Sequence, residues 1–153
     1  MLIDDDEGFR VRFKSVLEAV GNIAVVATAD AENAVTLAKT ICPDLILLDL
    51  LMPKLYELAV ADDLSSDNQT RDIPIAFVTS LVNADEATKI NRKPGSLYVL
   101  SKSAVGEELI ECIEEILQVN CKIIKKRNRY GFQEGRLGSQ RQSYVPQVLS
   151  HTY

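Results

Sequence analysis

The feature that most constrains the fold of this chain is a series of short apolar blocks that alternate with segments of helical periodicity. Between the first two blocks, for example, apolar residues recur at helical spacing at Phe9, Phe13 and Leu17. Such alternation is typical of βα units around a parallel sheet. We predict strands at the five apolar blocks, which are Met1–Ile3, Ile23–Ala27, Leu45–Leu48, Ile75–Val78 and Leu97–Leu100.

The segments between the predicted strands carry helix signals. Gly21 is a plausible end for the first helix, and Asp30 is a candidate cap for the second. A third helix is expected near Leu55–Leu64, and a last one after Ser103. The buried stripe of that last helix is predicted at Leu109, Ile110, Ile113, Ile116 and Leu117. The block at 45–48 is apolar without alternation, which predicts an α/β fold with helices on both faces of the sheet.

Length and charge predict one domain followed by a tail. The chain has 153 residues, too few for two ordinary domains, and its apolar periodicity stops near residue 119. Residues 1–119 hold 10 basic and 21 acidic side chains, whereas residues 120–153 hold 7 and 1. We predict an acidic domain at 1–119 and a basic tail at 120–153 that is flexible or ordered by a partner. The acidic domain argues against nucleic-acid binding.

Several classes of protein are disfavoured by what the sequence lacks. No apolar run is long enough to span a membrane, and the acidic N-terminal residues do not resemble a signal peptide, so we expect a cytoplasmic protein. Cys42, Cys112 and Cys121 lack metal-site spacing and are accompanied only by His151. We therefore expect reduced thiols rather than disulfides or a zinc site.

Polar residues follow four of the five predicted strands. They are Asp4-Asp5-Asp6, Asp49, Thr79-Ser80 and Ser101-Lys102. Since the ligand site of an open parallel sheet lies beyond the carboxyl ends of its strands, we expect these residues to meet. Clustered carboxylates repel one another unless a cation neutralises them. A hard divalent ion such as Mg²⁺ fits this need, because it prefers oxygen ligands.

The same residues suggest phosphoryl chemistry. Mg²⁺ usually takes one or two carboxylates and leaves positions for a phosphate oxygen. An aspartate such as Asp49 can attack phosphorus and form an acyl phosphate. Thr79 would donate a hydrogen bond to that phosphate, and Lys102 would supply a positive charge. Asp6 is better explained as a helix cap.

Residues 1 to about 119 resemble the receiver domain of two-component response regulators, of the CheY-like kind. The resemblance rests on Asp4-Asp5, on PDLILLDLLMP around Asp49, on IPIAFVTS ending near Thr79, and on Lys102. The spacings also match, with 44 residues from Asp5 to Asp49 and 30 from Asp49 to Thr79. The resemblance implies a doubly wound, flavodoxin-like sheet of five parallel strands in the order 2-1-3-4-5.

The resemblance also implies a function. Asp49 would accept a phosphoryl group from a sensor histidine kinase or a phosphotransfer protein, with Thr79 and Lys102 contacting the phosphate. Mg²⁺ would be held by Asp4, Asp5, Asp49 and the main-chain carbonyl of Leu51. The result would be a changed affinity for an output partner rather than turnover of a separate substrate, so we do not expect an enzyme. The output partner is not identified, and a homodimer stays open.

The chain departs from the family pattern at three places, which keeps an alternative open. Glu57 stands where glycine is common, and Ser103 replaces the proline that usually follows the lysine. The usual aromatic position is held by Val99, with Tyr98 one step away. A degenerate receiver that docks partners without phosphorylation is therefore the alternative. A phosphatase of the haloacid dehalogenase kind is disfavoured, because it needs an acid two residues after Asp49, where Leu51 stands.

Overall fold

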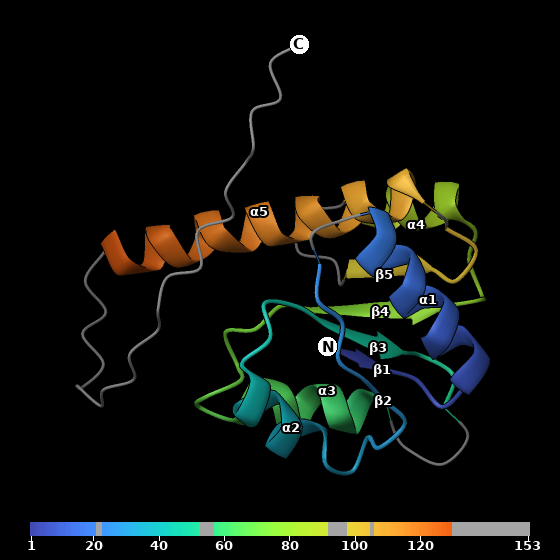
Figure 1. Cartoon of the computed structure of the whole chain (residues 1–153). Helices are drawn as coiled ribbons and strands as arrows, with labels where there is room; N and C mark the ends of the chain where they lie inside the picture. The colour runs from blue at the N-terminus through green and yellow to red at the C-terminus, as the bar shows by residue number, and fades with distance from the viewer. Residues whose placement is uncertain (21–22, 53–56, 92–97, 105, 130–153) are drawn as a thin grey trace.

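The computed structural model of this protein describes residues 1–20, 23–52, 57–91, 98–104 and 106–129. These residues form one parallel sheet with helices on both faces (Figure 1). Its five strands are β1 (Leu2–Ile3), β2 (Ala27–Thr28), β3 (Ile46–Asp49), β4 (Ile75–Thr79) and β5 (Tyr98–Ser101). They lie in the order β2-β1-β3-β4-β5, which confirms the predicted doubly wound sheet.

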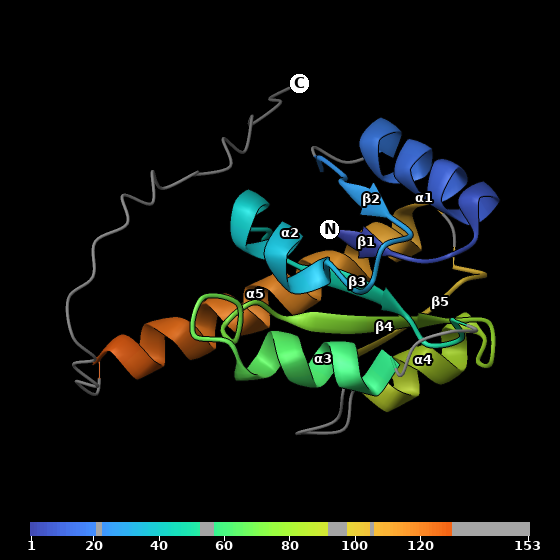
Figure 2. The same ribbon diagram turned by 90° about the horizontal axis from the view of Figure 1, so that it is seen from below.

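Five described helices surround the sheet: α1 (Glu7–Val20), α2 (Ala34–Ile41), α3 (Glu57–Ser66), α4 (Ala84–Asn91) and α5 (Glu107–Arg129). Helices α2 and α3 lie side by side on one face, whereas α1 and α5 cover the other (Figures 1 and 2). Helix α4 packs against the edge strand β5. No helix within the described residues is long and apolar enough to cross a membrane.

The strands alternate between two apolar cores, one on each face of the sheet. In β1, Leu2 belongs to the core under α1 and α5, and Ile3 to the core under α2 and α3. In β3, Leu47 faces the first core, while Ile46 and Leu48 face the second. Each of these residues is almost fully buried. Both faces are covered, which explains why these strands read as continuous apolar runs.

The predicted second strand, Ile23–Ala27, was placed too early in the chain. In the structure β2 covers only Ala27–Thr28, and pairing with β1 begins where Leu2 N donates to Val26 O at 2.8 Å. The backbone of Val25 binds side chains of α1 instead. Its carbonyl accepts from Lys14 Nζ at 2.9 Å, and its N–H donates to Glu18 Oε1 at 3.1 Å. These contacts tie the segment to the helix rather than to the sheet.

The predicted cap of α2 was also wrong. The residue that precedes the helix is Asn33, which makes no side-chain capping bond, and Asp30 lies one turn earlier. The Asp30 carboxylate accepts from the Asn33 N–H at 3.1 Å and from its side-chain amide at 2.8 Å. The sequence pattern identified the turn correctly but not its distance from the helix. Gly21, the predicted end of α1, lies outside the described residues.

Helix α5 continues to Arg129, past the boundary that we predicted at residue 119 (Figure 1). Its predicted stripe is confirmed, with Leu109, Ile113 and Ile116 at most 3% exposed. Residues 120–129 contain neither Gly nor Pro and are rich in Lys and Arg, which the helix dipole favours near a C-terminus. Local propensity thus extends the helix where no apolar stripe marks it. Residues 130–153 lie outside the described residues.

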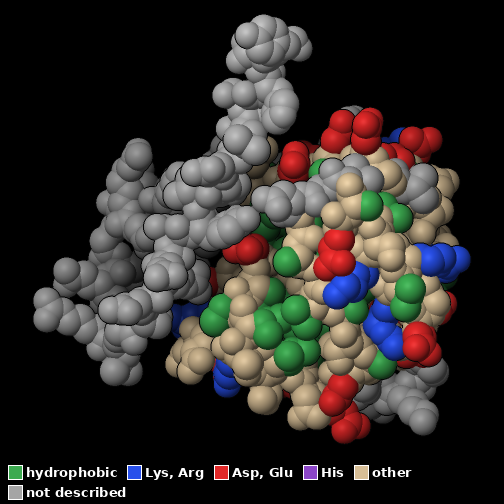
Figure 3. Space-filling model, in the orientation of Figure 1, with side chains coloured by type: hydrophobic (Ala, Val, Ile, Leu, Met, Phe, Trp, Pro, Cys, Tyr) green, Lys and Arg blue, Asp and Glu red, His purple; other side chains and the backbone are tan. Residues whose placement is uncertain are grey.

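The charges predicted for the domain lie partly on the solvent side of α5. All five glutamates in its first half are exposed, namely Glu107, Glu108, Glu111, Glu114 and Glu115. Figure 3 shows acidic side chains gathered along the upper edge of this face, where α4 and α5 lie in Figure 1.

Cys42 and Cys112 are free thiols. Burial, together with neighbouring glutamates, raises the pKa of Cys112, which favours the protonated thiol.

Candidate functional site

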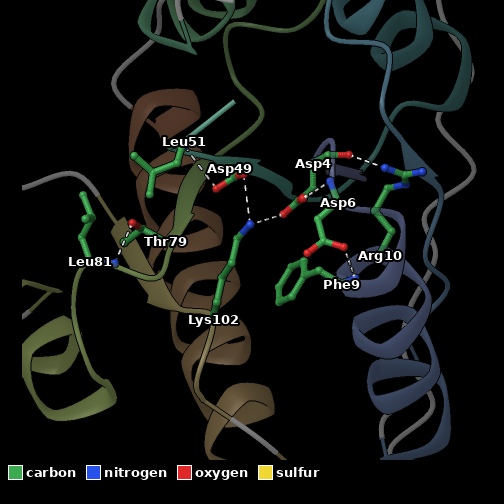
Figure 4. A network of polar contacts seen from close by, with 9 residues as sticks. All are labelled: Asp4, Asp6, Phe9, Arg10, Asp49, Leu51, Thr79, Leu81 and Lys102. Atoms are coloured by element: carbon green, nitrogen blue, oxygen red, sulfur yellow. Dashed lines mark hydrogen bonds and ion pairs between the residues drawn. The ribbon is translucent and has the colours of Figure 1, made fainter. Parts of the chain in front are cut away.

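The polar residues that follow the strands meet at the carboxyl edge of the sheet, as predicted (Figure 4). Asp4 follows β1, Asp49 ends β3, Thr79 ends β4, and Lys102 follows β5. Asp4, Asp49 and Thr79 are at most 2% exposed, which is unusual for polar side chains without a structural or functional role. Parallel pairing brings them together, since Asp49 lies beside Val78 and Thr79 beside Ser101 in the register.

Three carboxylates form the acidic part of this site. One oxygen each from Asp4, Asp5 and Asp49 lies within 4.8 Å of the others, and only Asp5 is exposed. Burial raises the pKa of Asp4, and the nearby charge of Asp49 raises it further, although contacts with Lys102 oppose both effects. The ionised form of Asp4 is therefore held at an energetic cost. A positive charge at this point offsets that cost.

Lys102 supplies a positive charge between two of the carboxylates. Its Nζ lies 2.7 Å from Asp4 Oδ2 and 3.0 Å from Asp49 Oδ2 (Figure 4). Burial by itself lowers the pKa of Lys102, but hydrogen bonds and charge from Asp4 and Asp49 outweigh it, so that the pKa is raised. The other oxygen of Asp49, Oδ1, accepts from the N–H of Leu51 at 3.2 Å.

The surroundings of Asp4 Oδ2 also fit a divalent cation. Asp4 Oδ2 is fully buried, and among the described residues its one polar contact is with the Lys102 ammonium, at 2.7 Å. Asp4 Oδ1, in contrast, accepts from the N–H of Asp6 at 2.8 Å. A buried carboxylate oxygen that is contacted only by a cation among the described groups is a favourable position for a hard metal ion, which also supplies positive charge.

Thr79 lies at the edge of the cluster. Its Oγ1 accepts from the N–H of Leu81 at 3.1 Å, which leaves the hydroxyl proton to donate to a ligand (Figure 4). Its carbonyl accepts from the N–H of Lys102 at 2.8 Å. The backbone therefore ties the end of β4 directly to Lys102.

The first turn of α1 holds the acidic loop in place. Asp6 Oδ1 accepts from the N–H of Phe9 at 3.0 Å, which confirms Asp6 as a helix cap. That bond, the largest of several effects, lowers the pKa of Asp6. Arg10 Nη1 donates to the carbonyl of Asp4 at 2.7 Å. The loop that carries Asp4 and Asp5 is thus fixed by two residues of the helix that follows it.

The departure at Ser103 leaves the position of Lys102 intact. All peptide bonds between described residues are trans, including the one before Ser103, yet Lys102 still reaches both carboxylates. Ser101 Oγ donates to the carbonyl of Val82 at 2.7 Å and lies 2.7 Å from Ser103 Oγ. This hydroxyl pair joins the loop after β5 to the loop after β4. The side chain of Glu57 lies outside the described residues.

The third departure, at the aromatic position, is accompanied by a side-chain clamp. Asn91, the last residue of α4, donates through Nδ2 to the carbonyl of Val99 at 2.8 Å. Its Oδ1 accepts from the N–H of Val99 at 2.8 Å. Tyr98 packs, half-buried, against the core under α1 and α5. The backbone of Val99 is therefore bound to α4 by two hydrogen bonds from one amide.

Sequence reasoning missed Arg10 and Asn91 as parts of the site and of its surroundings, and it placed Ser101 at this edge without its bond to Val82. Each acts through a backbone carbonyl or N–H, and such contacts depend on loop geometry that residue type does not reveal. Ser101 offered a weak signal, because a small polar residue stands at the end of a buried strand. Phe9 was predicted only as a core residue, although its ring also contacts Lys102.

Comparison with protein families matches residues 1–114 to the response regulator receiver domain. The polar-differentiation response regulator DivK of Brucella anthropi is 31% identical over 117 residues, which cover 76% of this chain and 94% of DivK. DivK of Brucella ovis gives the same values. The match spans every strand and the start of α5.

Solved structures with the same fold agree with this match. A response regulator from Desulfuromonas acetoxidans has a TM-score of 0.62 at 24% identity, covering 78% of this chain and 95% of that one. The chemotaxis protein CheY4 of Vibrio cholerae has a TM-score of 0.61 at 21% identity, over 75% of this chain and 94% of CheY4. NtrX of Brucella abortus reaches 0.67 at 21% identity, over 84% of this chain but only 29% of NtrX. These likenesses confirm the flavodoxin-like fold.

Proposed function

Since this chain belongs to the response regulator receiver domain family of two-component signalling, we propose that Mg²⁺-dependent phosphorylation of Asp49 switches its binding to a partner. Response regulators interact with histidine kinases or phosphotransfer proteins, and the donor proposed here is one of these. The family is generally a non-enzymatic signalling module. Accordingly, the proposed outcome is a change of conformation in the cytoplasm and not the turnover of a substrate.

The observation that carries the proposal is the position of Asp49. Its carboxylate is 2% exposed at the end of β3, with one oxygen bound by the Leu51 N–H and the other by Lys102. A purely structural aspartate has no need of two further carboxylates within 4.8 Å. A nucleophilic aspartate does, because the same cation binds those carboxylates and the incoming phosphoryl group.

Each described side chain has a role in this reaction. The cation would be held by Asp4, Asp5 and Asp49, with the carbonyl of Leu51 as a further ligand, and would neutralise charge on the phosphoryl oxygens. An Asp49 oxygen attacks phosphorus and forms a P–O bond. The bond between phosphorus and the donor breaks, and the donor leaves with the bonding electrons.

The product changes the contacts of the two remaining residues. Phosphorylation makes one carboxylate oxygen of Asp49 the bridging oxygen of an acyl phosphate, so that the Lys102 ammonium pairs with a phosphoryl oxygen instead. The hydroxyl of Thr79 donates to another phosphoryl oxygen. Because Thr79 Oγ1 also accepts from the Leu81 N–H, the loop after β4 moves with it. The change then reaches α4, β5 and α5, where the partner would bind.

We propose residues 1–119 as the receiver unit and the basic segment 120–153 as a separate contact for a partner. The opposite charges of the two segments support this division. The first part of the basic segment extends α5, which places it in direct continuity with the surface that the switch would alter.

The direct test is phosphorylation by a small-molecule donor. Purified protein is incubated with acetyl phosphate and Mg²⁺, and the intact mass is recorded for wild type and Asp49→Asn. Asp62→Asn, a change at an exposed aspartate of α3, is the matched control. We expect one phosphoryl group on wild type and on the control, and none on Asp49→Asn. Modification of Asp49→Asn, or none of wild type in the presence of Mg²⁺, contradicts the proposal.

A second candidate, a docking module that works without phosphorylation, draws support from the charge balance of the site. Lys102 already offsets part of the negative charge of Asp4 and Asp49 in the resting structure, and Asn91 clamps β5 to α4. Partner binding that is equal for wild type, Asp49→Asn and the phosphorylated protein would favour this function.

A further inference from the structure

We propose that Phe9 is a positioning residue for Lys102, and that the face of its ring holds the lysine ammonium at the phosphorylation site. The inference rests on the proposed function for its consequence in phosphorylation, but the contact itself exists in the resting protein. Lys102 Nζ lies 4.6 Å from the centre of the Phe9 ring. This distance is within the range of a cation–π interaction.

The ring and the two carboxylates approach the ammonium together. Figure 4 shows the Lys102 side chain rising past Phe9, with its nitrogen between Asp4 and Asp49. The side chain of Lys102 is 17% exposed, and Phe9 is 6% exposed, so water competes weakly for the ring face. A cation over an aromatic face is held more strongly when it is desolvated than when the pair is exposed.

The position of Phe9 is fixed independently of Lys102. Its N–H is bound by the Asp6 carboxylate, which sets the start of α1. Its ring packs on Phe13 one turn later, with centroids 5.0 Å apart and planes tilted by 36°. The helix therefore presents the ring to the site as a rigid surface, and the flexible lysine chain adapts to it.

The Phe9 ring provides a contact for the Lys102 ammonium that does not depend on the Asp49 carboxylate. When Asp49 becomes an acyl phosphate, Lys102 loses its present ion pair with Asp49 Oδ2 and must find a phosphoryl oxygen. The contact with Phe9 involves neither oxygen of Asp49, so it persists through the change. The ammonium therefore stays near the phosphoryl group instead of turning into solvent, so the entropic cost of ordering the lysine side chain is met before the reaction begins.

A core role alone does not account for this arrangement. Phe9 does belong to the apolar core, but a leucine or methionine would fill such a place as well. An aromatic ring in contact with a buried ammonium is a more specific arrangement. The two roles are separable, because a fluorinated ring keeps the shape of phenylalanine while its face loses negative character.

The experiment replaces Phe9 by pentafluorophenylalanine in the full chain, with the same replacement at Phe13 as the matched control. Phe13 packs in the same core and is 5% exposed, whereas the Lys102 ammonium lies over the ring of Phe9. Phe9→Leu and Phe9→Tyr are compared as encoded variants. Two readouts are taken: the ring-current shift of the Lys102 ε-methylene protons in the resting protein, and the rate of phosphorylation by acetyl phosphate with Mg²⁺.

We expect the fluorinated ring at position 9 to slow phosphorylation about 2- to 30-fold, the range that corresponds to about 0.5–2 kcal/mol. Phe9→Leu should abolish the upfield shift of the lysine methylene protons and slow the reaction similarly, and Phe9→Tyr should restore both. The replacement at Phe13 should leave both unchanged. In a Lys102→Met background, the fluorinated ring should have no further effect on the rate.

Equal rates for the two fluorinated proteins overturn the proposal, as does an additive effect in the Lys102→Met background. A resting protein without the methylene shift overturns it as well. This last readout needs no phosphorylation, so it separates failure of the Phe9 contact from failure of the proposed function, which the Asp49→Asn comparison tests.

Discussion

The ammonium of Lys102 lies 3.0 Å from Asp49 Oδ2 and also reaches Asp4 Oδ2 at 2.7 Å. Asp4 and Asp49 are both almost fully buried. The lysine therefore performs, in the resting protein, part of the charge neutralisation that a metal ion and a phosphoryl group would reorganise. The relationship makes the stability of the domain and the chemistry of its site depend on the same three residues.

Loss of the lysine should therefore destabilise the domain. We expect Lys102→Met to lower the free energy of unfolding by about 3 kcal/mol without Mg²⁺, because it leaves buried carboxylates without a counter-charge. Saturating Mg²⁺ should recover part of this loss. Urea denaturation measures both effects. The control Lys89→Met, at an exposed position of α4, should change stability by less than about 0.5 kcal/mol. A Lys102→Met protein as stable as wild type would contradict the assigned role.

Asp4 predicts a pH dependence of stability. Burial raises its folded-state pKa above the ordinary value of 3.8, with a further contribution from Asp49. A raised pKa means that the folded state binds the proton more tightly. The resulting stabilisation is fully present below 3.8 and is lost as pH rises through the folded-state pKa.

Metal-free Asp4→Asn, which mimics the protonated acid, should thus be more stable than wild type at neutral pH. The difference should shrink as the pH falls toward 3.8, and Mg²⁺ should reduce it at neutral pH by binding wild type. Urea denaturation across pH provides the measurement. A variant that is less stable than wild type at neutral pH without metal would show that Asp4 is not strained by burial.

The clamp between α4 and β5 gives a third prediction. Asn91→Ala removes both hydrogen bonds to Val99 and should cost about 1–3 kcal/mol. Hydrogen exchange should accelerate most at the Val99 amide. Asn68→Ala removes a bond between exposed side chains and should cost less than about 0.5 kcal/mol. Unchanged exchange at Val99 would rule the clamp out.

The hydroxyl pair of Ser101 and Ser103 gives a fourth prediction. Ser101 is 1% exposed, and Ser101→Ala leaves the carbonyl of Val82 without this donor, at a cost of about 1–3 kcal/mol. Ser103→Ala should cost clearly less, since Ser103 is exposed and Ser101 keeps its bond to Val82. Thermal denaturation of the two variants checks the order. The reverse order would mean that Ser103, and not Ser101, holds the loops together.

The residues of the site could be placed from sequence because the carboxyl ends of parallel strands lie at the same edge of the sheet. Asp4, Asp49, Thr79 and Lys102 each follow an apolar block, and that position alone brings them together. The two faces of the sheet could be predicted as well, because the block at 45–48 is apolar without alternation.

Other features depend on contacts that leave no sequence pattern. Residues 23–25 are as apolar as a strand, yet the side chains of Lys14 and Glu18 bind the backbone of Val25. The extension of α5 to Arg129 follows from helix propensity without an apolar stripe. The contact of Phe9 with Lys102 could not be predicted, because a buried aromatic residue at helical spacing is already explained by packing in the core.

The measurement that tests the central claim most directly is NMR of the protein with Mg²⁺ and beryllofluoride, which mimics a phosphoryl group on aspartate. Wild type is compared with Asp49→Asn. Our account predicts large shifts at Thr79, Leu81 and Lys102 and along α4, β5 and the first half of α5, in wild type only. No shifts in wild type, or the same shifts in Asp49→Asn, would contradict the claim that Asp49 operates a phosphorylation switch.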